Sequence, residues 1–274
     1  MNIIEYAFFQ NALLGSLLAS ILCGIIGTYI VTRRLVFISG GITHASFGGI
    51  GIGVFSGINP ILSAMVFAVL SACGVEWLSK RSDVREDSAI AVFWTLGMSV
   101  GIICCFLTPG FMPDLPSFLF GSILTIGTAD LWLLGILTAI VVATFSFFCR
   151  QIVSVAFDSI FARSQHLPVT LIEYFMMALI AMTIVSTLRM VGIVLAISLL
   201  TIPQMTANLF TFSFRRMIFL SIAIGWADCL IGLAISYQLN VPSGASIIFV
   251  GVIACSIECP PVFEHFAILV ALLW

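Results

Sequence analysis

Two polar side chains within the apolar stretches of this sequence belong to types that bind metal ions or move protons. His44 lies in the segment 43–46 (THAS), next to a run of glycines, and Asp228 lies beside Cys229 in a long apolar stretch. An ionisable group inside a membrane span is costly and usually faces a bundle interior or a pathway. His44 is therefore a candidate residue of a transport pathway, and Asp228 is a candidate cation ligand. The structural alternatives are a hydrogen-bonded histidine and an aspartate paired with a polar neighbour.

Several common chemistries are missing from the sequence. Lys80 is the only lysine and follows residues 77–79 (WLS), so there is no G-x-x-x-x-G-K-[ST] loop to cradle phosphates. None of the three histidines begins an H-E-x-x-H zinc motif, and no span holds acids paired for hydrolysis. The eight cysteines form no C-x-x-C pair and are expected to be small buried hydrophobes. These absences disfavour an enzyme and favour a transport function.

The elements that position these residues must be transmembrane helices. The chain has 274 residues, of which 61% are hydrophobic and 8% charged, whereas soluble domains are roughly 45 to 50% apolar and about 25% charged. This excludes an ordinary soluble protein, and no basic face supports nucleic-acid binding. We predict an all-α, polytopic membrane bundle of eight or nine spans, forming a single transmembrane domain over residues 1–274. The candidate spans are 7–31, 44–57, 60–79, 89–108, 131–149, 170–188, 191–212, 217–237 and 243–258.

Two regions depart from a simple span pattern. The span at 44–57 is short and rich in glycine, which predicts a broken or tilted element with a loosened backbone around His44. The proline-rich region 109–130 predicts a loop with a short half-helix around 118–126. Glu76 and Glu173 fall near span ends, where we expect solvated or snorkelling side chains.

The basic residues predict the orientation of the bundle. With nine crossings, nearly all of them fall on one side, which the positive-inside rule makes cytoplasmic, and only Arg189 falls on the other. This predicts a multi-pass membrane protein whose basic side faces the cytoplasm. The residues on the cytoplasmic side are Arg33, Arg34, Lys80, Arg81, Arg85, Arg150, Arg163, Arg215 and Arg216.

A short amphipathic helix is predicted on the cytoplasmic side within residues 154–170. Phe157, Ile160 and Phe161 recur there at helical spacing, Asp158 suits an N-cap, and Pro168 marks the stop before the next span. Such a helix either connects two spans or docks a partner.

Taken together, a series of short motifs resembles the permeases of zinc and manganese ATP-binding-cassette importers. The resemblance covers residues 7–255 in order and leaves the tail 258–274 unassigned. The motifs are 33–37 (RRLVF), 42–45 (ITHA), 86–90 (EDSAI), 119–124 (LFGSIL), Phe157-Asp158 with Ala162, 191–195 (VGIVL), 199–203 (LLTIP) and 242–245 (PSGA).

The resemblance implies a homodimer in a bacterial cytoplasmic (inner) membrane. This homodimer works with a cytoplasmic ATP-binding-cassette ATPase and receives metal from an extracytoplasmic metal-binding protein. ATP is then used by the partner subunit, the chain itself binds no cofactor, and zinc or manganese is its substrate. The segment Phe157, Asp158, Ile160, Phe161 and Ala162 becomes the element that couples to the ATPase.

One position departs from the family pattern. Family members commonly have an aspartate four residues before the histidine that matches His44, and both look like metal ligands. Here that position is Gly40. Loss of a carboxylate predicts a weaker site, a water-completed site, or one tuned toward a nitrogen-favouring metal such as zinc.

Two other functions stay open at this stage. One is a permease of the same architecture for a metal chelate or another small nutrient. The other is an intramembrane enzyme that uses His44 and Asp228 as an acid/base pair.

Overall fold

All elements in the described part of the chain are helices. The computed structural model describes residues 7–82, 84–108 and 127–258; the predicted half-helix at 118–126 and residues 259–274 of the tail lie outside them. The helices are α1 (Ala7–Thr32), α2 (Val36–Ser56), α3 (Pro60–Ser82), α4 (Glu86–Leu107), α6 (Thr128–Phe157), α7 (Ser159–Ser164), α8 (Val169–Leu199), α9 (Ile202–Phe210), α10 (Phe214–Leu239) and α11 (Ser243–Glu258).

The prediction of eight or nine crossings is confirmed. Within the described residues, eight helical segments are long and apolar enough to span a membrane, and α11 is a shorter apolar helix that matches the predicted ninth span. Each predicted span falls on helical residues, although 170–188 and the first part of 191–212 share α8, and α2 begins at Val36, eight residues before the predicted start.

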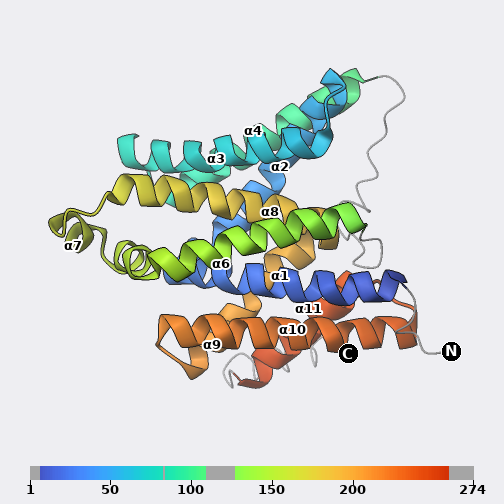
Figure 1. Ribbon diagram of the computed structural model, residues 1–274. Helices are drawn as coiled ribbons and strands as arrows, with labels where there is room; N and C mark the ends of the chain where they lie inside the picture. Colours follow the sequence, from blue (N-terminus) through green and yellow to red (C-terminus); the bar gives the residue numbers. More distant parts are fainter. Residues whose placement is uncertain (1–6, 83, 109–126, 259–274) are drawn as a thin grey trace, which may run out of the picture.

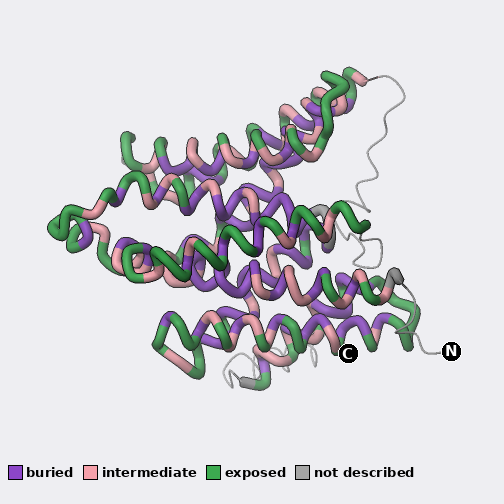
Figure 2. Tube along the Cα trace, in the orientation of Figure 1, coloured by how far each residue is buried: buried purple, intermediate pink, exposed green. Residues whose placement is uncertain are grey.

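The helices lie side by side as a bundle, with α3 and α4 along one edge and α10 along the other (Figure 1). The first two spans are mostly buried, whereas α3, α4, α6 and α10 turn most of their length outward. Figure 2 shows the buried residues concentrated where α1, α2 and α8 meet. The outward faces carry large apolar side chains, as a membrane-spanning surface requires.

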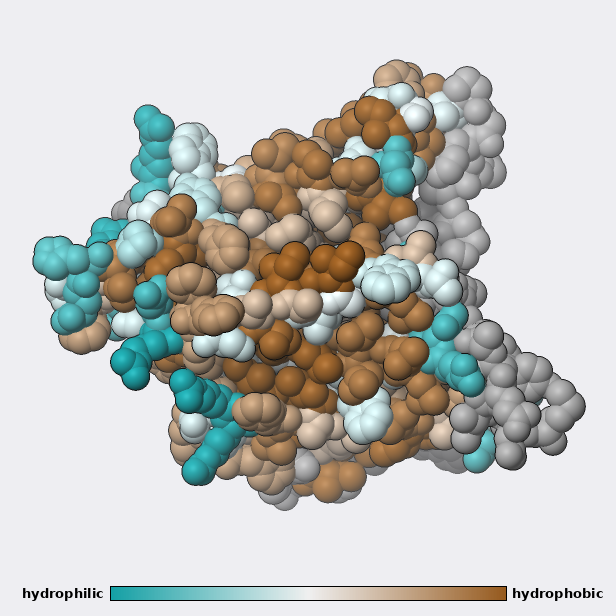
Figure 3. Space-filling view, in the orientation of Figure 1, coloured by the Kyte–Doolittle hydropathy of each residue, from teal (hydrophilic) through white to brown (hydrophobic). Residues whose placement is uncertain are grey.

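The polar surface gathers at the end of the bundle that carries α7, next to a broad apolar band (Figure 3). The chain turns at this end between α1 and α2, between α3 and α4, around α7, and between α9 and α10 (Figure 1). We call it the basic end, because these turns and the adjoining helix ends hold the basic residues assigned above to the cytoplasmic side.

The seventh span is a discontinuous helix. The helical trace turns at Gly192, whose φ of 80° only glycine adopts readily, and breaks again between Leu199 and Ile202. Gln204 is fully buried at the second break, where its Nε2 donates hydrogen bonds to the carbonyls of Cys23 (2.8 Å) and Leu199 (3.0 Å). A buried side chain thus satisfies the Leu199 carbonyl at this break in the helix.

Candidate metal pathway and coupling surface

His44 lies in the body of α2, eight residues after its first residue, which is about 12 Å along a helix. Its side chain is half-buried, and its ring stacks on Trp94 of α4 with centroids 4.6 Å apart and planes 3° from parallel. No hydrogen bond to the imidazole is found among the described residues. Both ring nitrogens are therefore available to a ligand from the open side of α2.

The glycines after His44 do not loosen the helix, so the prediction of a broken element at 44–57 is wrong. A Cβ added to Gly48 would lie 2.7 Å from the Gly97 carbonyl oxygen, and one added to Gly51 would lie 2.7 Å from that of Gly101. These glycines let α2 and α4 approach backbone to backbone, which is how small residues pack membrane helices. They pack α2 closely against α4 in the turns of helix that follow His44.

Gly40 lies one helical turn before His44 on the same side of α2. A Cβ at Gly40 would have one neighbour within 4 Å, Ile197 Cδ1 at 3.8 Å, which is an ordinary contact. By contrast, a Cβ at the next residue, Gly41, would lie 2.2 Å from Ile90 Cγ2. The position that lacks the family carboxylate therefore accepts a Cβ without a clash.

Asp228 lies in a different part of the bundle from His44. Its carboxylate is buried between α10 and α11, where a Cβ at Gly251 would lie 3.2 Å from Oδ2. α10 packs mainly on α1, α9 and α11, whereas α2 packs mainly on α3, α4 and α8. Within the described residues, no three His, Cys, Asp or Glu side chains cluster as a metal site. The structure does not join the two predicted pathway residues.

A buried ion-pair network connects three spans at the basic end, where the sequence predicted solvated acids. Glu173 of α8 accepts hydrogen bonds from Arg33 (3.1 Å) and from Lys80. Lys80 also pairs with Glu76 at 2.8 Å, and Arg33 lies 3.9 Å from Glu86. The Glu76 and Glu173 side chains are only 3% and 5% exposed, so that prediction is wrong.

The Arg33 side chain is mostly buried, but its neighbours favour the charged form. Burial opposes the charged form, but the neighbouring Tyr29 and Glu173 outweigh burial and raise the pKa of the guanidinium above its ordinary value. Glu76 and Lys80 are four residues apart on one helix, but the other pairs join residues 53 to 140 positions apart in the chain, so spacing along the sequence gave no signal for those.

The predicted amphipathic element is α7, which is shorter than expected because α6 continues to Phe157. Asp158 caps α7 as predicted: its Oδ1 accepts hydrogen bonds from the backbone N–H groups of Ile160 (3.0 Å) and Phe161 (2.8 Å). The predicted stop is also correct, since α8 begins directly after Pro168.

Apolar side chains project from this cap region into solvent. Phe157, Ile160 and Phe161 are 66%, 81% and 54% exposed, whereas Ala162 is fully buried against Val155 and Val169. A rigid turn that exposes three large apolar side chains at the basic end is typical of a protein-docking surface. We call these three side chains the α7 surface.

Comparison with known proteins identifies the architecture. A model of the ABC 3 transport family matches residues 5–258. The chain belongs to this family. The membership agrees with the described helices and makes the chain a membrane subunit of a transporter rather than an enzyme, so an intramembrane acid/base site at His44 and Asp228 is not supported.

Several similar proteins match most of the chain. An uncharacterized membrane protein of Synechocystis is 39% identical over 92% of this chain and 89% of its own. The manganese transport system membrane protein MntC of Listeria monocytogenes is 32% identical over 92% of this chain and 90% of its own. The structure of PsaBC from Streptococcus pneumoniae in complex with Fab has a TM-score of 0.82 at 28% identity, covering 93% of this chain and 91% of the matched chain.

Proposed function

We propose that the chain is the permease subunit of an importer for divalent metal ions, manganese or zinc, and that a separate ATPase subunit supplies the energy. Membership of the ABC 3 transport family and the manganese transport of named relatives support the substrate class. The observation that carries the proposal is His44, a half-buried imidazole that stacks on Trp94 and has no hydrogen-bond partner among the described residues.

His44 acts as a transient ligand in this proposal. Neutral imidazole binds borderline divalent ions, and manganese holds nitrogen ligands more weakly than zinc does. With Gly40 in place of a carboxylate, His44 is the ligand that this part of α2 supplies, and water completes the coordination. Weak, water-completed binding suits a transport site, because the ion must also leave. Asp228, which lies between other helices, serves a separate part of the pathway.

The α7 surface is the contact for the ATPase. Burying three large apolar side chains against a cytoplasmic partner provides a hydrophobic contact at the end of the bundle where the connecting turns gather. Metal arrives from an extracytoplasmic binding protein at the opposite end. Two copies of the chain form the complete pathway.

Metal uptake by cells tests the proposal. In a strain lacking the chromosomal copy, wild type should restore uptake of manganese or zinc supplied as free ions, and a chelate should not compete. His44→Phe keeps an aromatic ring to stack on Trp94 but removes both nitrogens, so uptake should fall at least tenfold at unchanged membrane abundance.

His44→Cys is the matched variant, since it loses the stacking ring but keeps a ligand atom, and it should retain part of the zinc uptake. Wild-type transport by His44→Phe would show that the ring only packs against α4. Uptake of a chelate but not of free ions would replace the metal-ion proposal with a chelate permease.

A further inference from the structure

Two apolar grooves flank the first turns of α10 at the basic end. One holds about 640 Å³ between α1, α6 and α10, and the other holds about 450 Å³ between α9 and α10. Phe219 lines both, so it forms the ridge between them. Other residues of the larger groove include Ile25, Phe145, Ser146 and Ile222; those of the smaller one include Phe210, Leu220 and Ala223.

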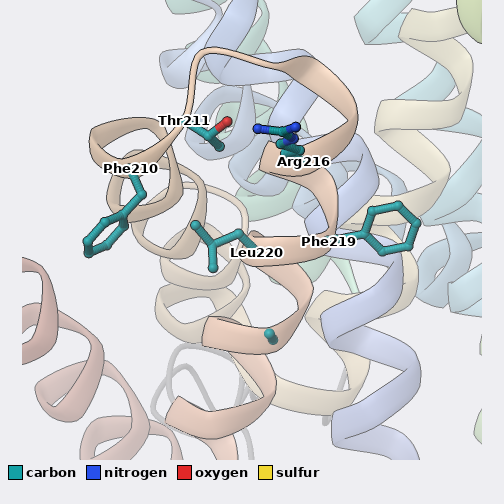
Figure 4. A pocket seen from close by; sticks show the side chains of 6 residues that line it. Phe210, Thr211, Arg216, Phe219 and Leu220 are labelled. Carbon is teal, nitrogen blue, oxygen red and sulfur yellow. The ribbon is translucent and has the colours of Figure 1, made fainter.

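Each groove has an arginine at its mouth. Arg215 lines the larger groove and Arg216 lines the smaller one, and both side chains are exposed. Figure 4 shows Arg216 beside Thr211 at the turn between α9 and α10, with Phe219 projecting from α10 on the side away from Phe210. The two charges therefore lie at the mouths of the two adjacent apolar grooves.

These positive charges have no acidic partner in the described part of the chain. The ion pairs found there involve Arg33 and Lys80, not the arginines of α10. Residues 199–227, which include α9 and the first half of α10, contain no aspartate or glutamate. Asp228 lies twelve residues beyond Arg216, about 18 Å along the helix. Within the described residues, no carboxylate balances this pair of charges.

The two arginines and the two grooves lie at the depths expected for lipid headgroups and acyl chains. α10 begins at Phe214, so Arg215 and Arg216 lie at its cytoplasmic boundary, while Ile222 and Ala223 lie about two turns deeper. Basic pockets above apolar grooves between spans, on the cytoplasmic side, are how membrane proteins hold acidic lipid headgroups.

We infer that this region binds an anionic two-chain phospholipid. The phosphate lies between Arg215 and Arg216, where guanidinium groups donate charge-assisted hydrogen bonds to it. One acyl chain occupies each groove, with Phe219 between them. The lipid would connect α9 to α1 and α6 through α10, next to the discontinuous seventh span.

Native mass spectrometry of the detergent-purified chain tests the site, with dioleoyl phosphatidylglycerol and dioleoyl phosphatidylcholine as probes. Their acyl chains are identical, so the headgroup charge alone differs. Two arginines near the surface predict a preference of roughly 30-fold for phosphatidylglycerol. The double variant Arg215→Gln and Arg216→Gln should bind both lipids equally. The matched control, Arg81→Gln with Arg85→Gln, removes the same charge from the basic end and should keep the preference.

Variants that fill the grooves test the acyl chains separately. Ser146→Trp and Ala223→Trp place an indole in the larger and the smaller groove without changing charge, and each should lower phosphatidylglycerol retention roughly tenfold. Unchanged retention in these variants and in the arginine variant overturns the site. Lost co-purification of the ATPase in the arginine variant, at wild-type lipid retention, would make this surface an ATPase contact. Dissociation of an oligomer by Ser146→Trp would make the groove an interface between copies.

Discussion

At the residue scale, the imidazole of His44 is held by a contact that leaves its nitrogens open. The stacking on Trp94 fixes the plane of the ring, while the packed glycines behind it keep α2 straight. The ligand is thus oriented by packing rather than by a hydrogen bond to one ring nitrogen. This differs from stable metal sites, in which a hydrogen bond from a second residue usually orients the histidine.

Gly40→Asp should strengthen metal binding. The new carboxylate lies one turn from the imidazole, in space that holds only the distant Ile197 methyl group. We expect about tenfold tighter manganese binding to purified protein, because manganese prefers oxygen ligands, and slower uptake, because release becomes harder. Titration calorimetry and cellular uptake measure the two effects. Gly41→Asp is the contrasting variant, since its Cβ meets Ile90 at 2.2 Å, and it should fail to accumulate.

Glu173→Ala should destabilise the folded protein. Removing this buried carboxylate takes away one partner of both Arg33 and Lys80 and leaves their charges less compensated. Breaking a buried pair costs about 3 kcal/mol or more, which corresponds to a fall in Tm of roughly 6 to 12 °C for a chain of this size. Thermal unfolding in detergent measures it. Asp87→Ala removes an exposed acid nearby, and an equal fall in that variant would argue against the network.

At the element scale, hydropathy predicted where each span lies but not how spans pack. The glycines of α2 predicted a broken helix because the sequence shows that they lack a side chain but does not show which helix they pack against. Their partners, Gly97 and Gly101, lie on α4 some fifty residues later. The same limit applies to the ion-pair network, whose members come from separate spans. Capping, in contrast, is local, and so Asp158 was predicted correctly.

Gly101→Leu should separate α2 from α4. A Cβ at this position would lie 2.7 Å from the Phe47 carbonyl oxygen, a backbone atom that cannot move aside. We expect the purified variant to elute as aggregate in size-exclusion chromatography, and little of it to reach the membrane. The matched control is Gly135→Leu on α6, where a Cβ has no neighbour within 4 Å. A normal elution profile for Gly101→Leu would contradict the packing.

The α7 surface should fail to bind the ATPase when it carries a charge. Phe157→Asp and Phe161→Asp each put an unpaired carboxylate in an apolar contact, at a cost of a few kcal/mol. Co-purification of the ATPase should drop at least tenfold while membrane abundance stays constant. Gln165→Asp adds the same charge to an exposed polar position of this turn and should leave the yield intact. Undiminished yield with both phenylalanine variants would remove the docking role.

At the scale of the whole molecule, the distribution of charge predicted the architecture better than any single motif did. The turns and adjoining helix ends at the basic end hold most of the arginines, as the positive-inside rule predicts for a cytoplasmic face. The sequence singles out His44 and the α7 residues because they stand out locally, and their roles stay predictions. The separation of Asp228 from His44 could not be predicted, because it depends on which helices become neighbours.

One protomer leaves the His44 side of α2 and most of α4 uncovered. Among the candidate spans, α4 is the least buried, and Trp94 is 37% exposed beside His44. A second copy that packs against α4 would enclose this side and complete a pathway, and two-fold pairing is the commonest symmetry of protein oligomers.

Native mass should therefore give two permease chains with two ATPases. Ser99→Cys, on the exposed side of α4, should yield crosslinked dimer beyond that of the parent chain, while the matched Ser146→Cys on α6 should not. An assembly with one permease chain would instead require α4 to face lipid and the pathway to lie within a single protomer.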